Sequence, residues 1–145
     1  MQELLSTYKK DPTLNGLSED GSPFSVLVVD DSRTCRQQME EIFSTVGYAV
    51  YLAEDLKGGL EQCQKHNPNV IALDMWMPGI LALEGLSEFL SKNPGVRIVM
   101  ISSEFQQARI TKALSLGAKD YFLKPIGEKQ LKKLLLSFKK LSLEG

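Results

Sequence analysis

Short apolar runs alternate with amphipathic stretches along most of the chain. Runs of four to six mainly apolar residues recur at 26–29, 48–53, 70–73, 96–101 and 120–123. Each run is short for a helix and lies near Gly, Pro, Asn or Asp, which is typical of strands buried on both faces. Between the runs, apolar residues recur every three or four positions, as in amphipathic helices. The sequence therefore predicts five strands that alternate with five helices.

Capping residues support several of these helix boundaries. Ser32 and Asp55 stand where two helices begin, and their side chains can accept hydrogen bonds from the first exposed amides. Gly47 and Gly117 stand where helices end, a position that favours glycine. The last helix has one apolar face, and we expect its lysines to be solvated on the remaining surface: Lys129, Lys132, Lys133, Lys139 and Lys140.

The alternation of strand and helix predicts an α/β fold in which helices cover both faces of a parallel sheet. Right-handed crossovers leave few possible topologies. We expect a flavodoxin-like (βα)5 doubly wound parallel sheet with strand order 2-1-3-4-5. The first and third strands would then be neighbours, with a crevice at their carboxyl ends.

Residues 1–23 do not follow the alternating pattern. Residues 1–10 can form two helical turns, and the remainder is rich in Pro, Gly, Asp and Ser, which predicts a flexible linker. We therefore divide the chain into an N-terminal extension, residues 1–23, and one domain, residues 24–145. No chemistry is assigned to the extension.

Composition narrows the classes of function. The chain has 145 residues, of which 43% are hydrophobic and 24% charged, as expected for one globular domain. The formal net charge of -1 favours neither nucleic acid nor a membrane surface, and no apolar run reaches the roughly 20 residues that span a bilayer. Cys35 and Cys63 lie in predicted helices, which favours free thiols and a cytoplasmic location. The single histidine, His66, disfavours a catalytic triad or a histidine metal site, and we expect it to be solvated near a helix end.

Polar residues follow the ends of four predicted strands. Asp30 and Asp31 follow the first strand, Asp74 the third, Ser102 the fourth and Lys124 the fifth. The carboxyl ends of parallel strands share one edge of a sheet, so these side chains should converge there. Three carboxylates beside a single lysine repel one another, and a divalent cation would neutralise them. Ligation by oxygen alone suits Mg²⁺.

A carboxylate in such a site suits covalent phosphoryl transfer. Asp74 would attack phosphorus in line, while Mg²⁺ and Lys124 neutralise the equatorial oxygens and the Ser102 hydroxyl binds one of them. An ionised carboxylate needs no general base. Each residue alone also fits a turn, a helix cap or a strand end, so the prediction depends on their combination.

These residues resemble the receiver domain of two-component response regulators over residues 24–141. The motifs are VLVVDDS, ALDMWMPG, VMISSE and GAKDYFLKPI. The resemblance implies that Asp74 accepts a phosphoryl group from the phosphohistidine of a sensor histidine kinase. It also implies that Lys124 and Ser102 contact the phosphoryl oxygens. Such a domain is a phosphoacceptor that promotes its own phosphorylation and dephosphorylation, and not an enzyme with a separate substrate.

The resemblance further assigns the metal ligands. Asp31, Asp74 and the backbone carbonyl of Trp76 would hold Mg²⁺ directly, and Asp30 would act mainly through water. The Lys124–Pro125 peptide bond is expected to be cis.

The resemblance also predicts a switch and an output surface. Ser102 and Tyr121 match the hydroxyl and aromatic residues that rearrange on phosphorylation. A downstream protein would bind the surface formed by the fourth helix, the fifth strand and the last helix. Trp76 and Glu104 would flank the hydrolytic water and modulate dephosphorylation, in which a phosphatase is a possible partner. No direct contact with nucleic acid and no membrane insertion is expected.

Three departures and three alternatives accompany this prediction. The segment MPGILALEG is three residues longer than the usual MPGMDG, Trp76 stands where smaller polar residues are common, and the N-terminal extension is unusual for the family. The closest subtype is a single-domain chemotaxis regulator of the CheY type; a receiver fragment of a longer regulator is the first alternative. A haloacid dehalogenase-like phosphatase expects a DxD pattern after the first strand, where this chain has Asp30-Asp31. A flavodoxin-like or dinucleotide-binding module expects a phosphate-binding loop there.

Overall fold

A five-stranded parallel sheet forms the centre of the protein. The computed structural model describes residues 1–74, 76–77, 80–103 and 106–145, and gives the backbone alone for 76–77 and 80–82. The strands, in the order in which they lie side by side, are β2 (Ala49–Ala53), β1 (Ser25–Val29), β3 (Val70–Leu73), β6 (Ile98–Ser102) and β7 (Asp120–Leu123). This order confirms the predicted flavodoxin-like 2-1-3-4-5 topology.

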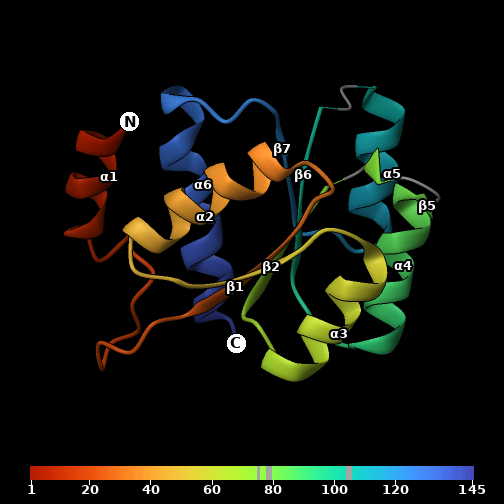
Figure 1. Ribbon diagram of the computed structural model, residues 1–145, viewed down its shortest axis with the longest axis horizontal. Coiled ribbons are helices and arrows are strands. Elements are labelled where there is room, and N and C mark those ends of the chain that lie inside the picture. Colours follow the sequence, from red (N-terminus) through yellow and green to blue (C-terminus); the bar gives the residue numbers. More distant parts are fainter. Residues whose placement is uncertain (75, 78–79, 104–105) are drawn as a thin grey trace.

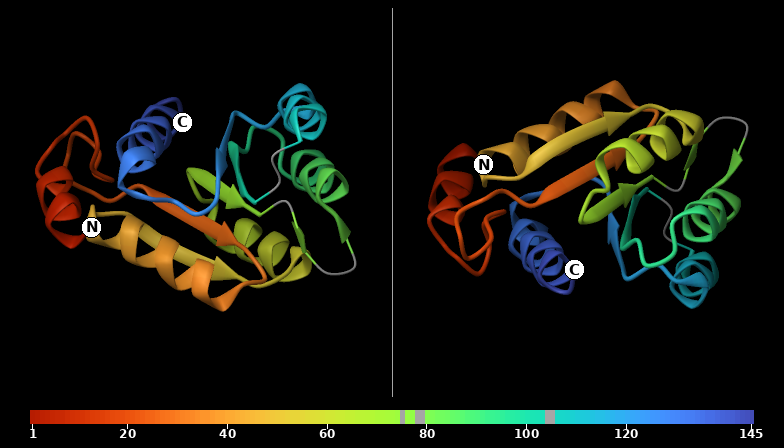
Figure 2. Two further views of the ribbon diagram at one scale, coloured as in Figure 1. Left: turned by 90° about the horizontal axis from the view of Figure 1, so that it is seen from above. Right: turned by 90° about the horizontal axis from the view of Figure 1, so that it is seen from below.

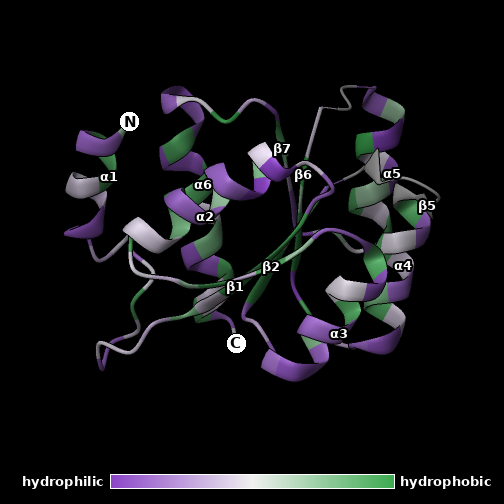
Figure 3. Ribbon diagram, in the orientation of Figure 1, coloured by the Kyte–Doolittle hydropathy of each residue, from purple (hydrophilic) through white to green (hydrophobic). Residues whose placement is uncertain are grey.

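Helices cover both faces of the sheet (Figures 1 and 2). On one side lie α2 (Arg33–Thr45) and α6 (Glu128–Leu143), and on the other lie α3 (Leu56–His66), α4 (Ala82–Lys92) and α5 (Gln107–Leu116). A further helix, α1 (Gln2–Lys9), lies outside α2 and α6. Apolar residues line the sheet, and polar residues face outward on the helices (Figure 3).

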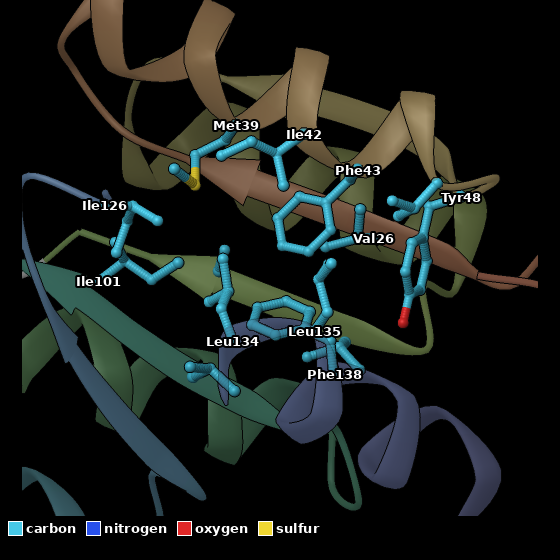
Figure 4. Close-up of a cluster of buried hydrophobic side chains, with 14 of the residues drawn as sticks. Val26, Met39, Ile42, Phe43, Tyr48, Ile101, Ile126, Leu134, Leu135 and Phe138 are labelled. Atoms are coloured by element: carbon cyan, nitrogen blue, oxygen red, sulfur yellow. The ribbon is translucent and has the colours of Figure 1, made fainter. Parts of the chain in front are cut away.

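Two apolar clusters stabilise this arrangement. The first lies between the sheet, α2 and α6, where Phe43 and Phe138 pack with their ring centroids 4.6 Å apart (Figure 4). The second lies between the sheet and α3, α4 and α5, with Phe89 fully buried. Full burial of such side chains contributes about 1.5–3 kcal/mol each.

The local signals for the helix boundaries are confirmed. Ser32 Oγ accepts a hydrogen bond from the Cys35 amide at 3.2 Å, and Asp55 Oδ1 accepts one from the Gly58 amide at 2.7 Å. Gly47 and Gly117 have positive φ angles of 109° and 125°. Both are therefore in backbone conformations that favour glycine.

Two short antiparallel strands lie in the lengthened segment after Asp74. They are β4 (Trp76–Met77) and β5 (Ile80–Leu81), paired Trp76 with Leu81 and Met77 with Ile80. The extra residues of MPGILALEG thus contribute to a second, two-stranded sheet that leads into α4. Residues 78 and 79 of this motif lie outside the described residues.

The N-terminal strap, residues 1–23, is folded against the domain, and the prediction of a flexible linker is wrong for its second half. Leu14 is fully buried, and the Gly16 amide donates to Val46 O at 2.9 Å. A Cβ atom on Gly16 would lie 2.4 to 2.7 Å from the ring and amide of Tyr48, so only glycine fits there. This segment is rich in turn-forming residues and has neither helical nor strand periodicity. Its burial could therefore not be predicted from the sequence.

Lys139 contradicts the prediction that all lysines of the last helix are solvated. It is 7% exposed, and its ammonium donates to Asn15 O at 2.9 Å, Asn15 Oδ1 at 3.0 Å and Leu17 O at 2.6 Å. These three acceptors compensate for the loss of water around the charge. Lys139 thereby ties the N-terminal strap to α6.

The cysteines and the histidine are placed as follows. Cys63 is buried, Cys35 is half-buried, and both are free thiols. His66 is the last residue of α3, as expected, but its ring stacks on Tyr51 with centroids 3.7 Å apart, so it is less solvated than predicted.

Within the described ranges, none of the helices has the length and apolar character needed to cross a membrane.

Candidate functional site

The predicted site residues converge at the carboxyl edge of the sheet. Sheet hydrogen bonds continue just past the strands: the Asp30 amide donates to Ala53 O at 3.0 Å and the Asp74 amide to Val29 O at 2.9 Å. The Lys124 amide donates to Ser102 O at 2.8 Å. The backbone of each residue is therefore held by a neighbouring strand, which fixes where its side chain begins.

Three carboxylates form a compact cluster at this edge. One oxygen from each of Asp30, Asp31 and Asp74 lies within 4.8 Å of the others. Asp30 and Asp74 are only 3% and 5% exposed, whereas Asp31 is exposed. An all-oxygen donor set with one open side fits a hard divalent cation that keeps part of its water shell. The residues present thus fit the expected class of metal ion.

Lys124 lies against this cluster. Its Nζ is 2.6 Å from Asp30 Oδ2 and 3.6 Å from Asp74 Oδ1. Burial acts to lower the pKa of Lys124, but the hydrogen bond that Lys124 donates to Asp30 and the charges of Asp74 and Asp30 outweigh it, so the pKa is raised. The side chain is therefore a permanent cation at neutral pH, placed between two buried carboxylates.

The remaining predicted residues are placed less completely. Ser102 is fully buried at the end of β6, and Tyr121 is half-buried on β7. The backbone of Trp76 lies in β4, two residues beyond Asp74, but its side chain and Glu104 lie outside the described residues. The Lys124–Pro125 bond is cis, as expected.

Two polar contacts near the site were not predicted from the sequence. Arg36 Nη1 donates to Asp30 O at 2.8 Å, and Gln38 Nε2 donates to Ile126 O at 3.2 Å. Both residues belong to α2, where polar residues usually face solvent. Their acceptors are backbone carbonyls, which leave no mark in the sequence, so only the folded structure reveals these contacts.

Comparison with known proteins agrees with the geometry. The sequence model described as "Response regulator receiver domain" matches residues 26–136. The chemotaxis protein CheY of Treponema pallidum is 38% identical over 131 residues, covering 83% of this chain and 89% of that protein. CheY of Thermotoga maritima is 31% identical over 103 residues, covering 69% of this chain and 84% of that protein.

Solved structures give the same result. A chain in the crystal structure of the CheX-CheY-BeF3-Mg complex from Borrelia burgdorferi superposes with a TM-score of 0.78 at 28% identity, covering 90% of this chain and 96% of that one. Vibrio cholerae CheY4 superposes with a TM-score of 0.70 at 29% identity, covering 77% and 95%. The chain belongs to the response regulator receiver domain family of two-component systems, with CheY chemotaxis proteins among its homologues.

Proposed function

We propose that the protein is a phosphorylation-dependent signalling switch with Asp74 as its phosphoacceptor. The observation that carries this proposal is the position of the Lys124 ammonium, 2.6 Å from Asp30 and 3.6 Å from Asp74, beside a three-carboxylate cluster. A buried aspartate next to a fixed cation suits a nucleophile that must meet a phosphate anion. We further propose that the domain modifies itself and does not turn over a separate substrate.

Phosphoryl transfer can be written from these residues. A carboxylate oxygen of Asp74 forms a bond to phosphorus, and the bond from phosphorus to the donor's imidazole nitrogen breaks, with its electron pair left on the imidazole. Lys124 neutralises charge on an equatorial oxygen, and the Ser102 hydroxyl donates a hydrogen bond to another. Asp31, Asp74 and the Trp76 carbonyl would hold Mg²⁺. When bound, the ion would supply further positive charge for the phosphoryl oxygens.

Asp30 has a different part in this scheme. Its Oδ1 accepts from the Ser32 amide at 2.9 Å and its Oδ2 accepts from Lys124 at 2.6 Å. Both oxygens already bind protein donors, which supports a role for Asp30 in orienting Lys124 and in reaching the cation mainly through water.

The proposed partners follow from membership of the family. Receiver domains of the CheY type interact with kinases and downstream targets, and here we propose a sensor histidine kinase as donor and a protein target on the α5–β7–α6 face. Rearrangement of Ser102 and Tyr121 would change that face. The Borrelia structure is a complex of CheY with CheX, so a CheX-type protein is the first binding partner to test. Homology to CheY supports a role in chemotaxis, and the free cysteines support a cytoplasmic location.

Phosphorylation by acetyl phosphate tests the proposal. We expect the native chain with Mg²⁺ to gain the mass of one phosphoryl group and to change the fluorescence of Trp76, its single tryptophan. Asp74→Asn should show neither change, because an amide is a poor nucleophile. Asp55→Asn is the matched control, an exposed residue after β2 at the same edge of the sheet, and should behave like the native chain. A native chain that gains no mass would refute phosphorylation at Asp74.

A second prediction concerns the lifetime of the phosphorylated state. Trp76 stands two residues after Asp74, where smaller polar residues are usual in the family, and we expect its bulk to alter the access of hydrolytic water. Trp76→Asn should change the dephosphorylation rate by about three- to tenfold, the scale of one well-placed contact. The decay of the phosphorylated mass peak after removal of acetyl phosphate measures this rate, and equal decay in both proteins would refute the idea.

A further inference from the structure

Helix α2 contacts the backbone on both sides of the Asp30–Lys124 ion pair. From Arg36, Nη1 donates to Asp30 O at 2.8 Å, and from Gln38, Nε2 donates to Ile126 O at 3.2 Å. Both side chains are half-buried, whereas Arg33 and Gln37 on the same helix are exposed. The two contacts therefore come from side chains that are partly withdrawn from solvent.

The Gln38 contact fixes the segment that carries Lys124. This segment is anchored at two points: the Lys124 amide binds Ser102 O at 2.8 Å, and Ile126 is 2% exposed in the core. Gln38 adds a third anchor, from a helix 88 residues away in sequence, at the carbonyl of Ile126. The start of the Lys124 side chain is thus fixed relative to α2.

The Arg36 contact completes the fixation of Asp30. The amide of Asp30 binds Ala53 O, its Oδ1 binds the Ser32 amide, and its carbonyl accepts from Arg36. With Oδ2 on Lys124, the residue has a protein partner at each polar group. The carboxylate consequently offers Lys124 one well-defined position.

We propose that Gln38 and Arg36 are positioning residues for phosphoryl transfer at Asp74, an inference that rests on the proposed function. A lysine side chain has a flexible four-carbon stem, so its ammonium is held in place only if both its backbone and its carboxylate partner are held. Gln38 fixes the backbone on the Lys124 side and Arg36 fixes the Asp30 side. Small displacements of a charge-neutralising group lower the rate of a reaction that depends on positioning.

Gln38→Met is the first test, because it keeps length and removes the donor. The rate of phosphorylation by saturating acetyl phosphate with Mg²⁺ should fall about two- to tenfold, the scale of one lost hydrogen bond. Gln37→Met makes the same change one residue away at an exposed position and should leave the rate unchanged. Gln38→Lys, which retains an N–H donor of sufficient reach, should recover most of the rate.

Arg36 gives an independent second test. Arg36→Met should slow phosphorylation on the same scale, and Arg36→Lys, which keeps a donor, should retain most of the native rate. Arg33→Met, at an exposed position of the same helix, is the matched control and should have no effect.

A readout without metal or phosphate separates positioning from a general loss of stability. In the metal-free protein, backbone amide NMR shifts at Lys124 and Ser32 should move in Gln38→Met and Arg36→Met respectively, with thermal midpoints close to those of the controls. A lowered midpoint with native rates and native shifts at these amides would overturn the inference. If the native chain is not phosphorylated at all, the proposed function fails. Positioning by α2 is tested separately: amide NMR shifts at Lys124 and Ser32 that are unchanged in both variants would refute it.

Discussion

Lys124→Met is expected to abolish phosphorylation of Asp74 and to destabilise the metal-free protein by about 3 kcal/mol. The side chain of Lys124 is 15% exposed and that of Asp30 only 4%, so the ion pair is largely removed from water. Without the ammonium, Asp30 loses its Oδ2 partner, and Asp74 loses the nearby charge at 3.6 Å. Two buried carboxylates then repel each other, and the phosphoryl oxygens lose a neutralising cation.

The pH dependence of this contribution follows from the raised pKa of Lys124. A lysine whose pKa is raised in the folded state contributes stability that is fully present below its unfolded value, here 10.5, and is lost as the pH rises through the higher folded value. The difference between native and Lys124→Met stability should therefore stay constant through the neutral range and shrink above pH 10.5.

Chemical denaturation with and without Mg²⁺ measures the stability of this variant. Mg²⁺ should restore part of the loss, because it also neutralises the three carboxylates. Lys119→Met is the matched control, because Lys119 is exposed and directly precedes β7, the strand that Lys124 follows. This substitution should change neither stability nor phosphorylation. Native stability of metal-free Lys124→Met would contradict the view that this ion pair stabilises the fold.

The sheet and the cluster at its edge could be predicted because their signals are local and repeat. Five apolar runs each end in a turn or a polar residue, and parallel pairing brings the ends of the strands to one edge. Asp30, Asp74, Ser102 and Lys124 therefore had to lie near one another once the fold class was known. Their distances could not be predicted, because a shift of one rotamer decides whether Lys124 reaches Asp30, Asp74 or both.

Contacts between distant segments could not be predicted, because the local sequence pattern does not indicate which distant residue is the partner. From the sequence, Lys139 belongs to the polar surface of α6 and is predicted to be solvated. In the structure its ammonium binds the carbonyls of Asn15 and Leu17. Gln38 looks like any surface glutamine of an amphipathic helix. In both cases a polar side chain binds a backbone carbonyl, and every residue has one, so the sequence gives no sign of which carbonyl is used.

The same reasoning explains the N-terminal strap. It closes over the α2 and α6 side of the sheet, where Leu5 and Leu14 join the apolar cluster that contains Phe43 and Phe138. Hydrophobic periodicity reveals helices and strands, so it cannot reveal that Leu14, which lies in a segment of turns, is buried. Leu5 and Leu14 of the strap are thus part of the core, which changes what a mutation at either position should do.

Leu14→Ala is expected to destabilise the protein by about 2–5 kcal/mol, as for other fully buried leucines. Leu14 has no exposed surface, so truncation removes apolar contacts and leaves a cavity beneath the strap. A flexible linker would predict no loss, because its side chains would already be in water. Leu136→Ala, at a site on α6 that is 43% exposed, is the matched control and should cost less than about 1 kcal/mol.

Denaturant midpoints of the two variants decide between these predictions, and limited proteolysis locates the effect. In Leu14→Ala, cleavage within residues 11–23 should accelerate before cleavage elsewhere, because loss of the anchor opens the strap first. The Lys139 contacts to Asn15 and Leu17 oppose that opening, so the strap should remain partly protected even in the variant. Equal stability of Leu14→Ala and the native chain, with rapid cleavage of the strap in both, would show that residues 1–23 do not contribute to the fold.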